Sequence, residues 1–512
     1  MMSGNLLEER WQQLPEAAVR RLQAERLRHY LRRVVLPFSA HYRKLFHEAG
    51  IQVDSIRTLE DLQRIPFTTK VDLLNTPERP QKFRDFLVVP EEKVLARRPS
   101  TILQALVRGR KRVKQELESE FRPIFLTFTT GRSAEPTSFF YTQHDLTNLM
   151  TAARRLVEVC TSKPEDRLLN TLPFAPHLAF WLTHYAGTAG GIMTLSSGGG
   201  KVMGTEGNIR LLRSFKPNVL IGIPTFVYHL MHQAVEQGVH CENLKGIVLA
   251  GEKVSDGLRH KLRDLATELG GKDVDVLATY GFTEAKQAWA ECPSHGQLSS
   301  GYHLYPDLGV MEVVDPKTGK TVGPEQPGEL VFTPLDARGT VVLRYRTGDY
   351  IDGGLTYEPC PHCGRRLPRL VGNISRRSEV REMNLDKIKG TLVDFNQMEH
   401  VLDDAPDIGA WQVELRKLHD DPLELDELVL HVQKINGTDE TQISRDLRQR
   451  FISHLEIQPN QILFHTAEEI QKLQGVGTLL KEQKLVDRRP AIPKYTISQP
   501  KVAEVAPESG RE

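Results

Sequence analysis

The chain has 512 residues, and at about 150 residues per domain this length predicts two to four domains. Its 67 Lys and Arg residues balance 66 Asp and Glu residues, and a net charge of +1 argues against a dedicated nucleic-acid binder. No stretch approaches the roughly 18 apolar residues that a membrane span needs, and the charged N-terminus lacks the apolar core of a secretory signal. Composition therefore predicts a soluble, cytoplasmic protein.

The first part of the chain is predicted to be helical and rich in charge. Residues 6–35 place Leu, Arg and Glu at helical spacing, and Pro15 opens a second helix. Residues 108–120, RGRKRVKQELESE, form a charge run without an apolar stripe and predict a solvated helix or loop. The alternative is a basic rim that attracts a phosphorylated ligand.

From about residue 121, short apolar runs alternate with helical patterns. Runs that predict buried strands cover 123–128, 166–174, 191–196, 218–224, 245–251 and 275–281. Helical patterns cover 146–159, 225–238 and 256–270. This alternation predicts an α/β fold with a parallel or mixed sheet that helices cover on both faces.

Two other sequence patterns follow toward the C-terminus. Near residue 308, Gly and Pro turns between apolar runs begin to predict β-hairpins. Beyond 375, helical stretches at 394–404 and 439–454 bracket an apolar strand, which predicts a small α+β domain. The tail from Pro490 contains four prolines and few apolar residues, so it is predicted to be disordered.

The first motif with chemical potential is FLTFTTGR at 125–132. An apolar strand followed by clustered Thr and Gly offers hydroxyls and open backbone N–H groups to a phosphate. A Thr-Thr-Gly turn also occurs commonly without any ligand, so the motif alone does not show that this segment binds a phosphate.

The second motif, ATYGFTE at 278–284, directly follows an apolar strand, and ligands bind at such strand ends in α/β sheets. Tyr280 is suited to stack on a base, Thr283 to bond a phosphate and Glu284 to bind Mg²⁺ as a hard oxygen ligand. The alternative is a strand exit with a helix-capping Thr.

The third motif is VLRYRTGDY at 342–350. Its two arginines occupy alternate positions on one strand face, and Asp349 follows a Gly turn, where it is suited to accept both hydroxyls of a ribose. A surface hairpin tolerates the same residues.

The five cysteines are an odd number and a poor disulfide framework, so a reducing compartment is expected. Cys360-Pro-His-Cys363 resembles a zinc knuckle, which needs two more ligands for a tetrahedral site. Cys292 precedes two candidates, His295 and His303. The alternative is a reduced thiol pair in a turn.

Taken together, these motifs resemble the adenylate-forming (acyl-CoA synthetase) superfamily, and most closely its phenylacetate–coenzyme A ligase family. FLTFTTGR, GIVLAGEK, ATYGFTEA and LRYRTGDY stand in the family's order, and the resemblance covers most of the chain. It implies a large N-terminal adenylation domain (1–375) of layered mixed sheets with flanking helices and a β-rich subdomain. It also implies a small mobile α+β C-terminal domain (376–490), followed by the disordered tail (491–512).

The resemblance implies ATP- and Mg²⁺-dependent activation of a small carboxylic acid to an acyl adenylate, followed by transfer to coenzyme A. Two alternatives stay open: an adenylating enzyme that loads a carrier protein or another acceptor, and a non-catalytic nucleotide-binding descendant. No nucleic acid is expected as a partner, and dimers are common among relatives.

The resemblance also implies roles for individual residues. The phosphate loop would consist of Thr127, Thr129, Thr130 and Gly131. The adenine ring would lie beside Ala250, Gly251, Glu252, Tyr280 and Gly281. Thr283 would reach the α-phosphate, Glu284 would bind Mg²⁺, and Asp349 would bind the ribose hydroxyls. The catalytic lysine would be Lys481, with Lys484 as the competitor. In the segment 172–187, which replaces the family's Gly-rich substrate segment, Phe174, His177, Phe180 and Trp181 are suited to line an acyl pocket, and packing in the core is the alternative. A structural zinc would be held by Cys292, His303, Cys360 and Cys363, with His295 as substitute for His303.

The chain departs from the family pattern at two places. Phe128 stands where the family phosphate loop has Gly, and Phe does not freely adopt positive φ. The hinge segment, residues 375–390, reads SRRSEVREMNLDKIKG and does not match the family's hinge pattern, so no hinge residue is assigned in it.

Overall fold

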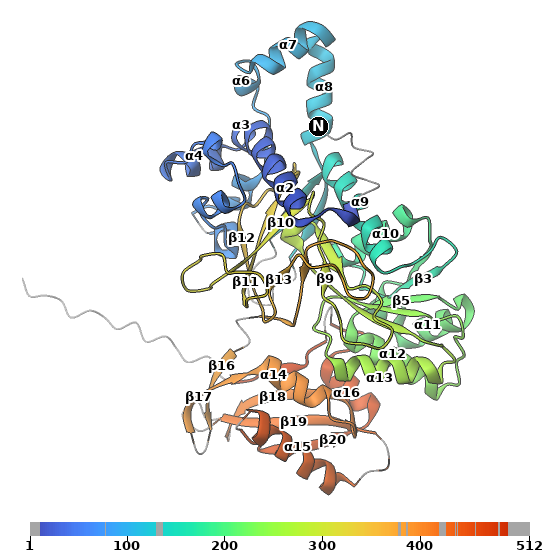
Figure 1. Cartoon of the computed structure of the whole chain (residues 1–512). Helices are drawn as coiled ribbons and strands as arrows, with labels where there is room; N and C mark the ends of the chain where they lie inside the picture. Colours follow the sequence, from blue (N-terminus) through green and yellow to red (C-terminus); the bar gives the residue numbers. More distant parts are fainter. Residues whose placement is uncertain are drawn as a thin grey trace, which may run out of the picture.

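A computed structural model describes residues 11–76, 78–129, 137–376, 380–385, 388–418, 426–435, 437, 439–455, 457–479 and 482–489. Its centre is a six-stranded sheet of order β4-β3-β5-β6-β7-β8 (Figure 1). The strands are β3 (Arg167–Asn170), β4 (Met193–Ser196), β5 (Val219–Gly222), β6 (Gly246–Leu249), β7 (Asp275–Phe282) and β8 (Gln287–Ala290). All neighbours pair in parallel except β7 and β8, so the mixed sheet predicted from the sequence is confirmed.

The helices between these strands form two groups. They are α9 (Gln143–Val159), α10 (Leu178–Gly190), α11 (Gly199–Phe215), α12 (Pro224–Glu236) and α13 (Asp256–Glu268). Helices α9 and α10 pack on each other and on β3, β4 and β8, whereas α12 and α13 pack on each other and on β5 and β7. Right-handed crossovers that run in opposite directions along a sheet place their helices on opposite faces. Both faces are therefore covered, and β5 and β8 are buried along their whole length.

One strand prediction was wrong in its placement. Residues 123–128 form β1 (Pro123–Phe128), which pairs antiparallel with β2 (Ser138–Thr142) in a sheet of two strands. The apolar run predicts a buried strand without naming its partner. Here the next strand along the chain supplies a local antiparallel partner, and the central sheet is built from later segments.

Two smaller sheets form the β-rich part that the sequence predicted near residue 308. One has the order β10-β11-β12-β15 and the other β13-β14-β9. Their strands are β9 (Tyr302–His303), β10 (Gly309–Val314), β11 (Gly328–Pro334), β12 (Tyr345–Ile351), β13 (Leu355–Thr356), β14 (Arg369–Leu370) and β15 (Ile374–Arg376). Together with the central sheet they bury one large hydrophobic core.

The N-terminal region is helical, as predicted. Its elements are η1 (Trp11–Gln13), α2 (Glu16–Tyr30), η2 (Leu31–Val35), α3 (Leu36–Phe38), α4 (Ala40–Glu48), η3 (Val53–Ser55), η4 (Glu60–Arg64), α5 (Lys70–Leu73), η5 (Lys82–Phe86), α6 (Glu92–Leu95), α7 (Pro99–Arg108) and α8 (Arg110–Phe121). Pro15 precedes the first residue of α2, as the sequence indicated. Figure 1 shows α6, α7 and α8 extending away from the body of the molecule.

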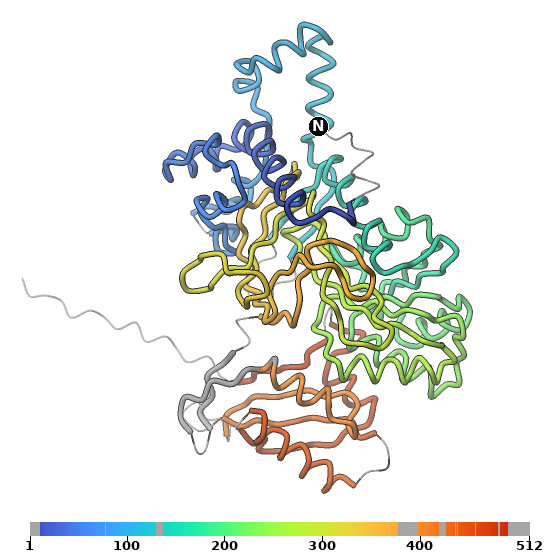
Figure 2. Tube along the Cα trace, in the orientation of Figure 1, coloured from blue at the N-terminus to red at the C-terminus, as the bar shows by residue number. Residues whose placement is uncertain are grey.

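The C-terminal region has its own sheet of order β20-β19-β18-β21 and its own core. Its elements are β16 (Val380–Leu385), β17 (Ile388–Asp394), α14 (Phe395–Asp403), β18 (Ile408–Lys417), β19 (Asp426–Lys434), α15 (Glu440–Leu455), β20 (Gln461–His465), α16 (Ala467–Gln474) and β21 (Leu485–Asp487). Figure 2 shows this part, orange to red, gathered below the rest of the chain. A separate hydrophobic core agrees with the predicted small α+β domain.

Polar side chains connect the two regions. Ser255 Oγ donates to Asp403 Oδ2 at 2.6 Å, and His229 Nε2 lies 2.6 Å from Gln474 Oε1. Burial lowers the pKa of His229 to about 4, so this imidazole is neutral near pH 7. Apolar side chains contribute as well, since Ala410 and Ile470 of the C-terminal region join the large hydrophobic core. Interfaces between the domains of one chain commonly permit relative motion.

Among the residues that the structure describes, no helix combines the length and the apolar character that crossing a bilayer requires.

Candidate active site

Predicted site residues meet where the central parallel strands end. Residues Ala250, Gly251 and Glu252 follow β6, and the Glu252 carboxylate accepts a 2.8 Å hydrogen bond from Thr225 Oγ1, which follows β5. Tyr280 lies on the last part of β7. The carboxyl ends of adjacent parallel strands share one edge of a sheet, and ligands bind at this edge in α/β proteins.

Asp349 joins three distant segments at this edge. It lies on β12, is only 6% exposed, and accepts a 2.9 Å hydrogen bond from the Tyr280 hydroxyl. Arg376 on β15 donates to its other carboxylate oxygen, also at 2.9 Å. Burial raises the pKa of the Asp349 carboxyl, while the Arg376 charge opposes that rise. The sequence-predicted pair Tyr280 and Asp349 is thus in contact, and Arg376 is a neighbour that sequence reasoning missed.

Half-buried Glu284 and buried Tyr345 form a second contact beside the first. It belongs to the turn η6 (Thr283–Ala285) that follows β7, and its carboxylate accepts a 2.6 Å hydrogen bond from the Tyr345 hydroxyl. Burial raises the pKa of Glu284, and this hydrogen bond opposes the rise. We call Tyr280, Glu284, Tyr345, Asp349 and Arg376 the carboxylate pocket.

The turn that carries Thr283 and Glu284 is fixed by the next residue. Lys286 adopts a left-handed φ of 58° and is buried. Its ammonium donates to the Phe140 carbonyl at 2.8 Å and lies 3.2 Å from an Asp145 carboxylate oxygen. Burial lowers the pKa of Lys286, although the Asp145 charge favours the ammonium form. These contacts set where Glu284 points.

The phosphate-loop prediction falls only partly on described residues. Thr127 is buried with its hydroxyl 3.4 Å from the Tyr141 hydroxyl. Two hydrogen bonds of 3.1 Å join Thr129 and Thr137. The Thr129 backbone N–H donates to the Thr137 carbonyl, and the Thr137 backbone N–H donates to the Thr129 hydroxyl. Thr130 and Gly131 lie outside the described residues. The two ends of the loop are therefore pinned together.

The two arginines of the third motif lie close together, since both guanidinium groups lie over the Phe67 ring, at 4.2 and 5.2 Å from its centre. Arg344 is 2% exposed and forms an ion pair with Glu312 at 3.0 Å, and Arg346 pairs with Glu329. Arg344 has a left-handed φ of 45°, which breaks the regular alternation before β12 begins. Both arginines therefore brace the β-rich sheet.

The candidate acyl-pocket residues form one aromatic group. Trp181 packs edge-on against Phe125, Phe174 and Phe180 at centroid separations of 5.5, 6.0 and 5.4 Å. Phe174 is 59% exposed, although large aromatic side chains are usually buried. His177 Nδ1 lies 3.1 Å from the Phe128 carbonyl oxygen, at the start of the phosphate loop. The group contains packed members and one side chain that is open to solvent.

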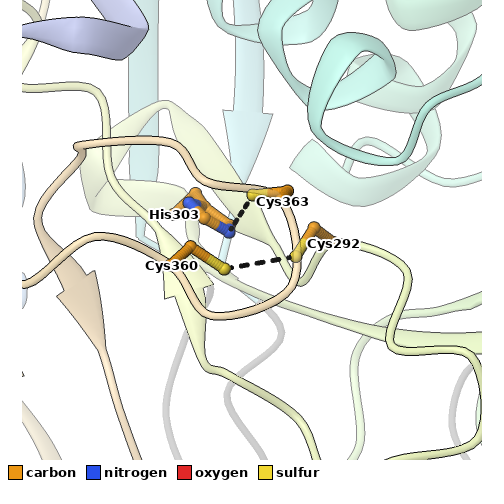
Figure 3. A group of neighbouring side chains, drawn as sticks. All are labelled: Cys292, His303, Cys360 and Cys363. Atoms are coloured by element: carbon orange, nitrogen blue, oxygen red, sulfur yellow. Dashed lines mark hydrogen bonds between the residues drawn. The ribbon is translucent and has the colours of Figure 1, made fainter.

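The four predicted zinc ligands converge, as Figure 3 shows. One ligand atom from each of Cys292, His303, Cys360 and Cys363 lies within 4.8 Å of all the others. The Sγ atoms of Cys292 and Cys360 are 3.6 Å apart, and Cys363 Sγ is 3.7 Å from His303 Nε2. A tetrahedral zinc with bonds of about 2.3 Å to sulfur requires ligand separations of about 3.8 Å, so this Cys/His cluster fits the metal.

The alternative ligand His295 is not part of the Cys/His cluster. Its side chain is 82% exposed, and its Nδ1 lies 3.5 Å from an Asp275 carboxylate oxygen. The structure therefore brings together the set with His303. Cys160 and Cys241 lie apart from the cluster as buried thiols.

Of the two candidate lysines, Lys481 lies outside the described residues. Lys484 is enclosed, with its ammonium 3.7 Å from an Asp403 carboxylate oxygen and 4.7 Å from the centre of the Trp411 ring. Lys484 thus pairs within the C-terminal region, and it also lines a small cavity with Thr225 and Lys261 of the N-terminal region.

An α/β sheet whose strand ends bring such side chains to one edge is the architecture in which many enzymes bind a nucleotide. The family model described as AMP-binding enzyme matches residues 21–334, more than half of the chain. The chain therefore belongs to the AMP-binding enzyme family.

Comparisons with curated relatives and with solved structures agree with this family assignment. The chain is 29% identical over 401 residues to a phenylacetate-coenzyme A ligase of Thermus thermophilus, with 77% of each chain covered. It is 28% identical to a phenylacetate-coenzyme A ligase of Pseudomonas putida, with 71% of each covered. A 2-hydroxyisobutyryl-CoA ligase solved in the postadenylation state with 2-HIB-AMP matches with a TM-score of 0.73 and 20% identity, over 94% of this chain and 92% of that one. The predicted fold class, with a large N-terminal and a small C-terminal domain, is thus confirmed.

Proposed function

We propose that this protein is an ATP-dependent carboxylic acid–coenzyme A ligase that works through an acyl adenylate. The observation that carries the proposal is the carboxylate pocket at the strand ends of an AMP-binding fold, where buried Asp349 and half-buried Glu284 are both hydrogen-bonded. The names of the curated relatives, phenylacetate-coenzyme A ligases, favour coenzyme A as acceptor.

The proposed reaction has two steps. A carboxylate oxygen attacks the α-phosphorus of ATP, the bond to pyrophosphate breaks, and an acyl adenylate forms. The coenzyme A thiolate then attacks the acyl carbon, and AMP leaves. Both steps place negative charge on the α-phosphate, and preorganised positive groups stabilise such charge most effectively in a water-poor site.

The residues of the pocket suit these needs. Asp349 would accept the ribose hydroxyls in place of its present hydrogen bonds, and adenine would lie against Tyr280 beside Ala250, Gly251 and Glu252. Glu284 would bind Mg²⁺, since an ionised carboxylate is a hard oxygen ligand, and Thr283 would reach the α-phosphate. The loop from Thr129 through Gly131 would hold the other phosphates.

Lys481 is the proposed catalytic lysine. The separate core of the C-terminal region and its polar contacts at Ser255 and His229 support a domain (376–490) that rotates between the two steps and withdraws this lysine. Lys484 is the weaker candidate because its ammonium already pairs with Asp403.

A structural zinc in the Cys/His cluster completes the proposal. Three thiolates and one imidazole fill a tetrahedral shell and leave no position open for a substrate, so the metal would hold structure only. It would join the loop after β8 to the turn after β13.

The test is pyrophosphate release from the full chain with ATP, Mg²⁺ and hydroxylamine across a panel of aryl-acetic and short aliphatic acids. We expect at least one acid to release pyrophosphate, and Lys481→Ala to reduce that rate by about 10²–10³-fold while thermal stability stays unchanged. Lys484→Ala tests the competing lysine three residues away, and we expect it mainly to lower stability because it removes the ammonium beside the buried Asp403 carboxylate.

Acyl-CoA formation after addition of coenzyme A separates this proposal from loading of a carrier protein. Pyrophosphate release by no acid on the panel, together with nucleotide binding, would instead support a non-catalytic descendant.

A further inference from the structure

Helices α6, α7 and α8 form an arm that leaves the body of the protein at the end opposite the C-terminal region (Figure 1). Helix α7 (Pro99–Arg108) runs along the outer part of the arm and contains no buried residue. Gly109, with a φ of 86°, makes the turn into α8, where a side chain would be strained. The arm thus presents a helix that the body does not cover.

The exposed surface of α7 is apolar along one stripe. At 100° per residue, Ile102, Leu103, Leu106 and Val107 lie within an arc of about 140°. They are 44%, 63%, 78% and 75% exposed. Thr101 and Ala105 lie outside this arc, on a less exposed side of the helix. Four large aliphatic side chains on one projecting helix are more than the isolated surface residues that any soluble protein shows.

The same arm is strongly basic, in contrast to the whole chain. Residues 92–121 contain eight Lys and Arg residues and four Glu residues, a net charge of +4, although the net charge of the full chain is +1. The four Glu residues lie at the two ends of the arm, so 93–114 contains all eight basic residues and no Asp or Glu. Arg108 and Arg112 pair with Glu116 at 2.7 and 3.2 Å, and Lys114 pairs with Glu92 at 3.3 Å. Within the described residues, no side-chain hydrogen bond or ion pair is formed by Lys93, Arg97, Arg110 or Lys111.

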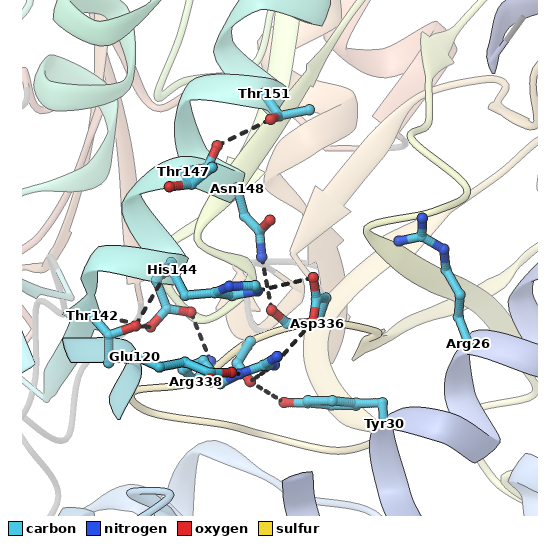
Figure 4. A network of polar contacts seen from close by, with 12 residues as sticks. Arg26, Tyr30, Glu120, Thr142, His144, Thr147, Asn148, Thr151, Asp336 and Arg338 are labelled. Carbon is cyan, nitrogen blue, oxygen red and sulfur yellow. Dashed lines mark hydrogen bonds and ion pairs between the residues drawn. The ribbon is translucent and has the colours of Figure 1, made fainter. Parts of the chain in front are cut away.

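The base of the arm is fixed to the body, as Figure 4 shows for α8. Glu120 accepts a 2.7 Å hydrogen bond from Arg338, which also pairs with Asp336 at 3.0 Å. The Phe121 ring packs edge-on against Phe38 at 5.1 Å. The arm is therefore anchored at its base and exposes its outer helix.

We propose that this arm docks the protein onto an anionic phospholipid bilayer, with α7 lying in the plane of the interface. An amphipathic helix binds such surfaces by burying its apolar stripe at the headgroup boundary and placing nearby cations among the phosphates. Here the cations are Arg108 at the end of α7 and the Lys and Arg residues that flank the helix on both sides. Long Lys and Arg side chains reach the headgroups while their aliphatic stems stay with the stripe. The ten residues of α7 span about 15 Å, too short to cross a bilayer but suited to lie on it.

A second copy of the chain is the less favoured occupant of the stripe. Pairing two α7 stripes would bring two groups of eight basic residues together with no acidic residue from 93–114 between them. A bilayer that contains anionic lipid supplies both the apolar layer and the opposite charge. The arm also lies far from the C-terminal region, so docking would leave that region free to move (Figure 2).

The test is co-sedimentation of the purified full chain with vesicles of phosphatidylcholine alone and of phosphatidylcholine with about 30% phosphatidylglycerol. We expect binding at least about tenfold stronger to the anionic vesicles, weakening as salt rises from about 0.05 to 0.5 M because salt screens exposed charges. Equal or absent binding to the two vesicle types would overturn the proposal.

Two variants locate the effect. Leu106→Ser/Val107→Ser removes the two most exposed apolar side chains of α7, and Arg110→Glu/Lys111→Glu reverses two cations that lack an ion-pair partner among the described residues. We expect each to reduce vesicle binding at least about fivefold. The controls Ile452→Ser and Lys272→Glu alter exposed residues far from the arm and should bind as the unchanged chain does.

Thermal unfolding and nucleotide binding check that every variant is folded, so a failure of this proposal is separable from a failure of the ligase proposal. Wild-type binding by Leu106→Ser/Val107→Ser would show that the stripe is not the docking surface. Loss of a dimer in light scattering by that variant, with unchanged vesicle binding, would assign the stripe to contacts between two copies and overturn the membrane proposal.

Discussion

The carboxylate pocket and the Cys/His cluster join the same two stretches of chain in different ways. The pocket connects β7 to β12 and β15 through Tyr280, Asp349 and Arg376, and the cluster connects Cys292 and His303 to Cys360 and Cys363. The Arg376 side chain is 57% exposed and ends a strand that leads toward the C-terminal region, whereas Cys292 and His303 are almost fully buried.

The difference separates two tasks. In the pocket, Asp349 and Glu284 are held by hydroxyls and a guanidinium, which the nucleotide and Mg²⁺ of the proposed reaction would replace. In the cluster, four enclosed ligands have no substrate to exchange with. We expect damage to the cluster to appear first as lost stability, and damage to the pocket as lost chemistry.

The largest effect is expected from the cluster. Cys360→Ser/Cys363→Ser should abolish zinc binding and lower the free energy of unfolding by about 4 kcal/mol, the contribution of a ligand present at a thousandfold its Kd. Metal analysis and denaturant unfolding measure both. Cys241→Ala is the matched control, since Cys241 is a buried thiol outside the cluster, and its zinc content should be unchanged. Wild-type stability of the double variant would contradict a structural metal.

Glu284→Gln should break the pocket without unfolding it. The amide keeps the size of the side chain and still accepts a hydrogen bond from Tyr345, but it loses the negative charge that Mg²⁺ needs. We expect pyrophosphate release to fall about 10²–10³-fold with little change in stability. Tyr345→Phe, which removes the hydrogen bond and keeps the carboxylate, should have a smaller effect. A Glu284→Gln rate within about threefold of wild type would exclude Glu284 as the Mg²⁺ ligand.

Asp349→Asn should weaken ATP binding by about 10- to 100-fold, because a hydrogen bond to a charged group is worth about 1.5–3 kcal/mol. Tyr280→Phe removes one partner of Asp349 and leaves its charge, so it serves as the milder companion. Calorimetric titration with a non-hydrolysable ATP analogue measures both. The reverse order of the two effects would argue against a ribose role for Asp349.

Much of this arrangement could be predicted from the sequence because it follows from local pattern. The strand runs at 218–224, 245–251 and 275–281 became β5, β6 and β7, and the strand-end motif placed Tyr280 and Glu284 at the shared edge. The Cys360–Cys363 spacing fixes two thiolates on one turn whatever the rest of the fold does.

The remainder depended on contacts that spacing does not encode. Arg376 reaches Asp349 only because β15 pairs with β12, and no hydrophobic periodicity in the sequence predicts that strand pairing. The buried pair of Arg344 with Glu312 was likewise not predictable, because it joins residues 32 positions apart in the chain. The partner of β1 was missed because an apolar run predicts burial but not the neighbouring strand.

The smallest effect, and the sharpest test of the comparison, is the response of Glu284 to pH. Burial raises its pKa above the ordinary value near 4.5, so the folded protein binds a proton at pH values where the unfolded chain has lost it. Stability from this proton is present at low pH and is lost as pH rises through the raised pKa. A tenfold gain in proton affinity on folding corresponds to about 1.4 kcal/mol of this stability. Relative to Glu284→Gln, which does not titrate, the wild-type chain should therefore gain stability as pH falls from 7.5 toward 5.

Activity should change in the opposite direction over the same window, because a protonated Glu284 cannot bind Mg²⁺. Two measurements from pH 5 to 8 test this: denaturant unfolding of both proteins, and the initial rate of pyrophosphate release by the wild type. As pH falls, relative stability should rise and the rate should fall. If rate and relative stability fall together on the acid side, the loss of activity reports unfolding and not the titration of the pocket. The Cys360→Ser/Cys363→Ser chain, where it remains folded, should keep this pattern, because the cluster and the pocket hold the same strands by independent means.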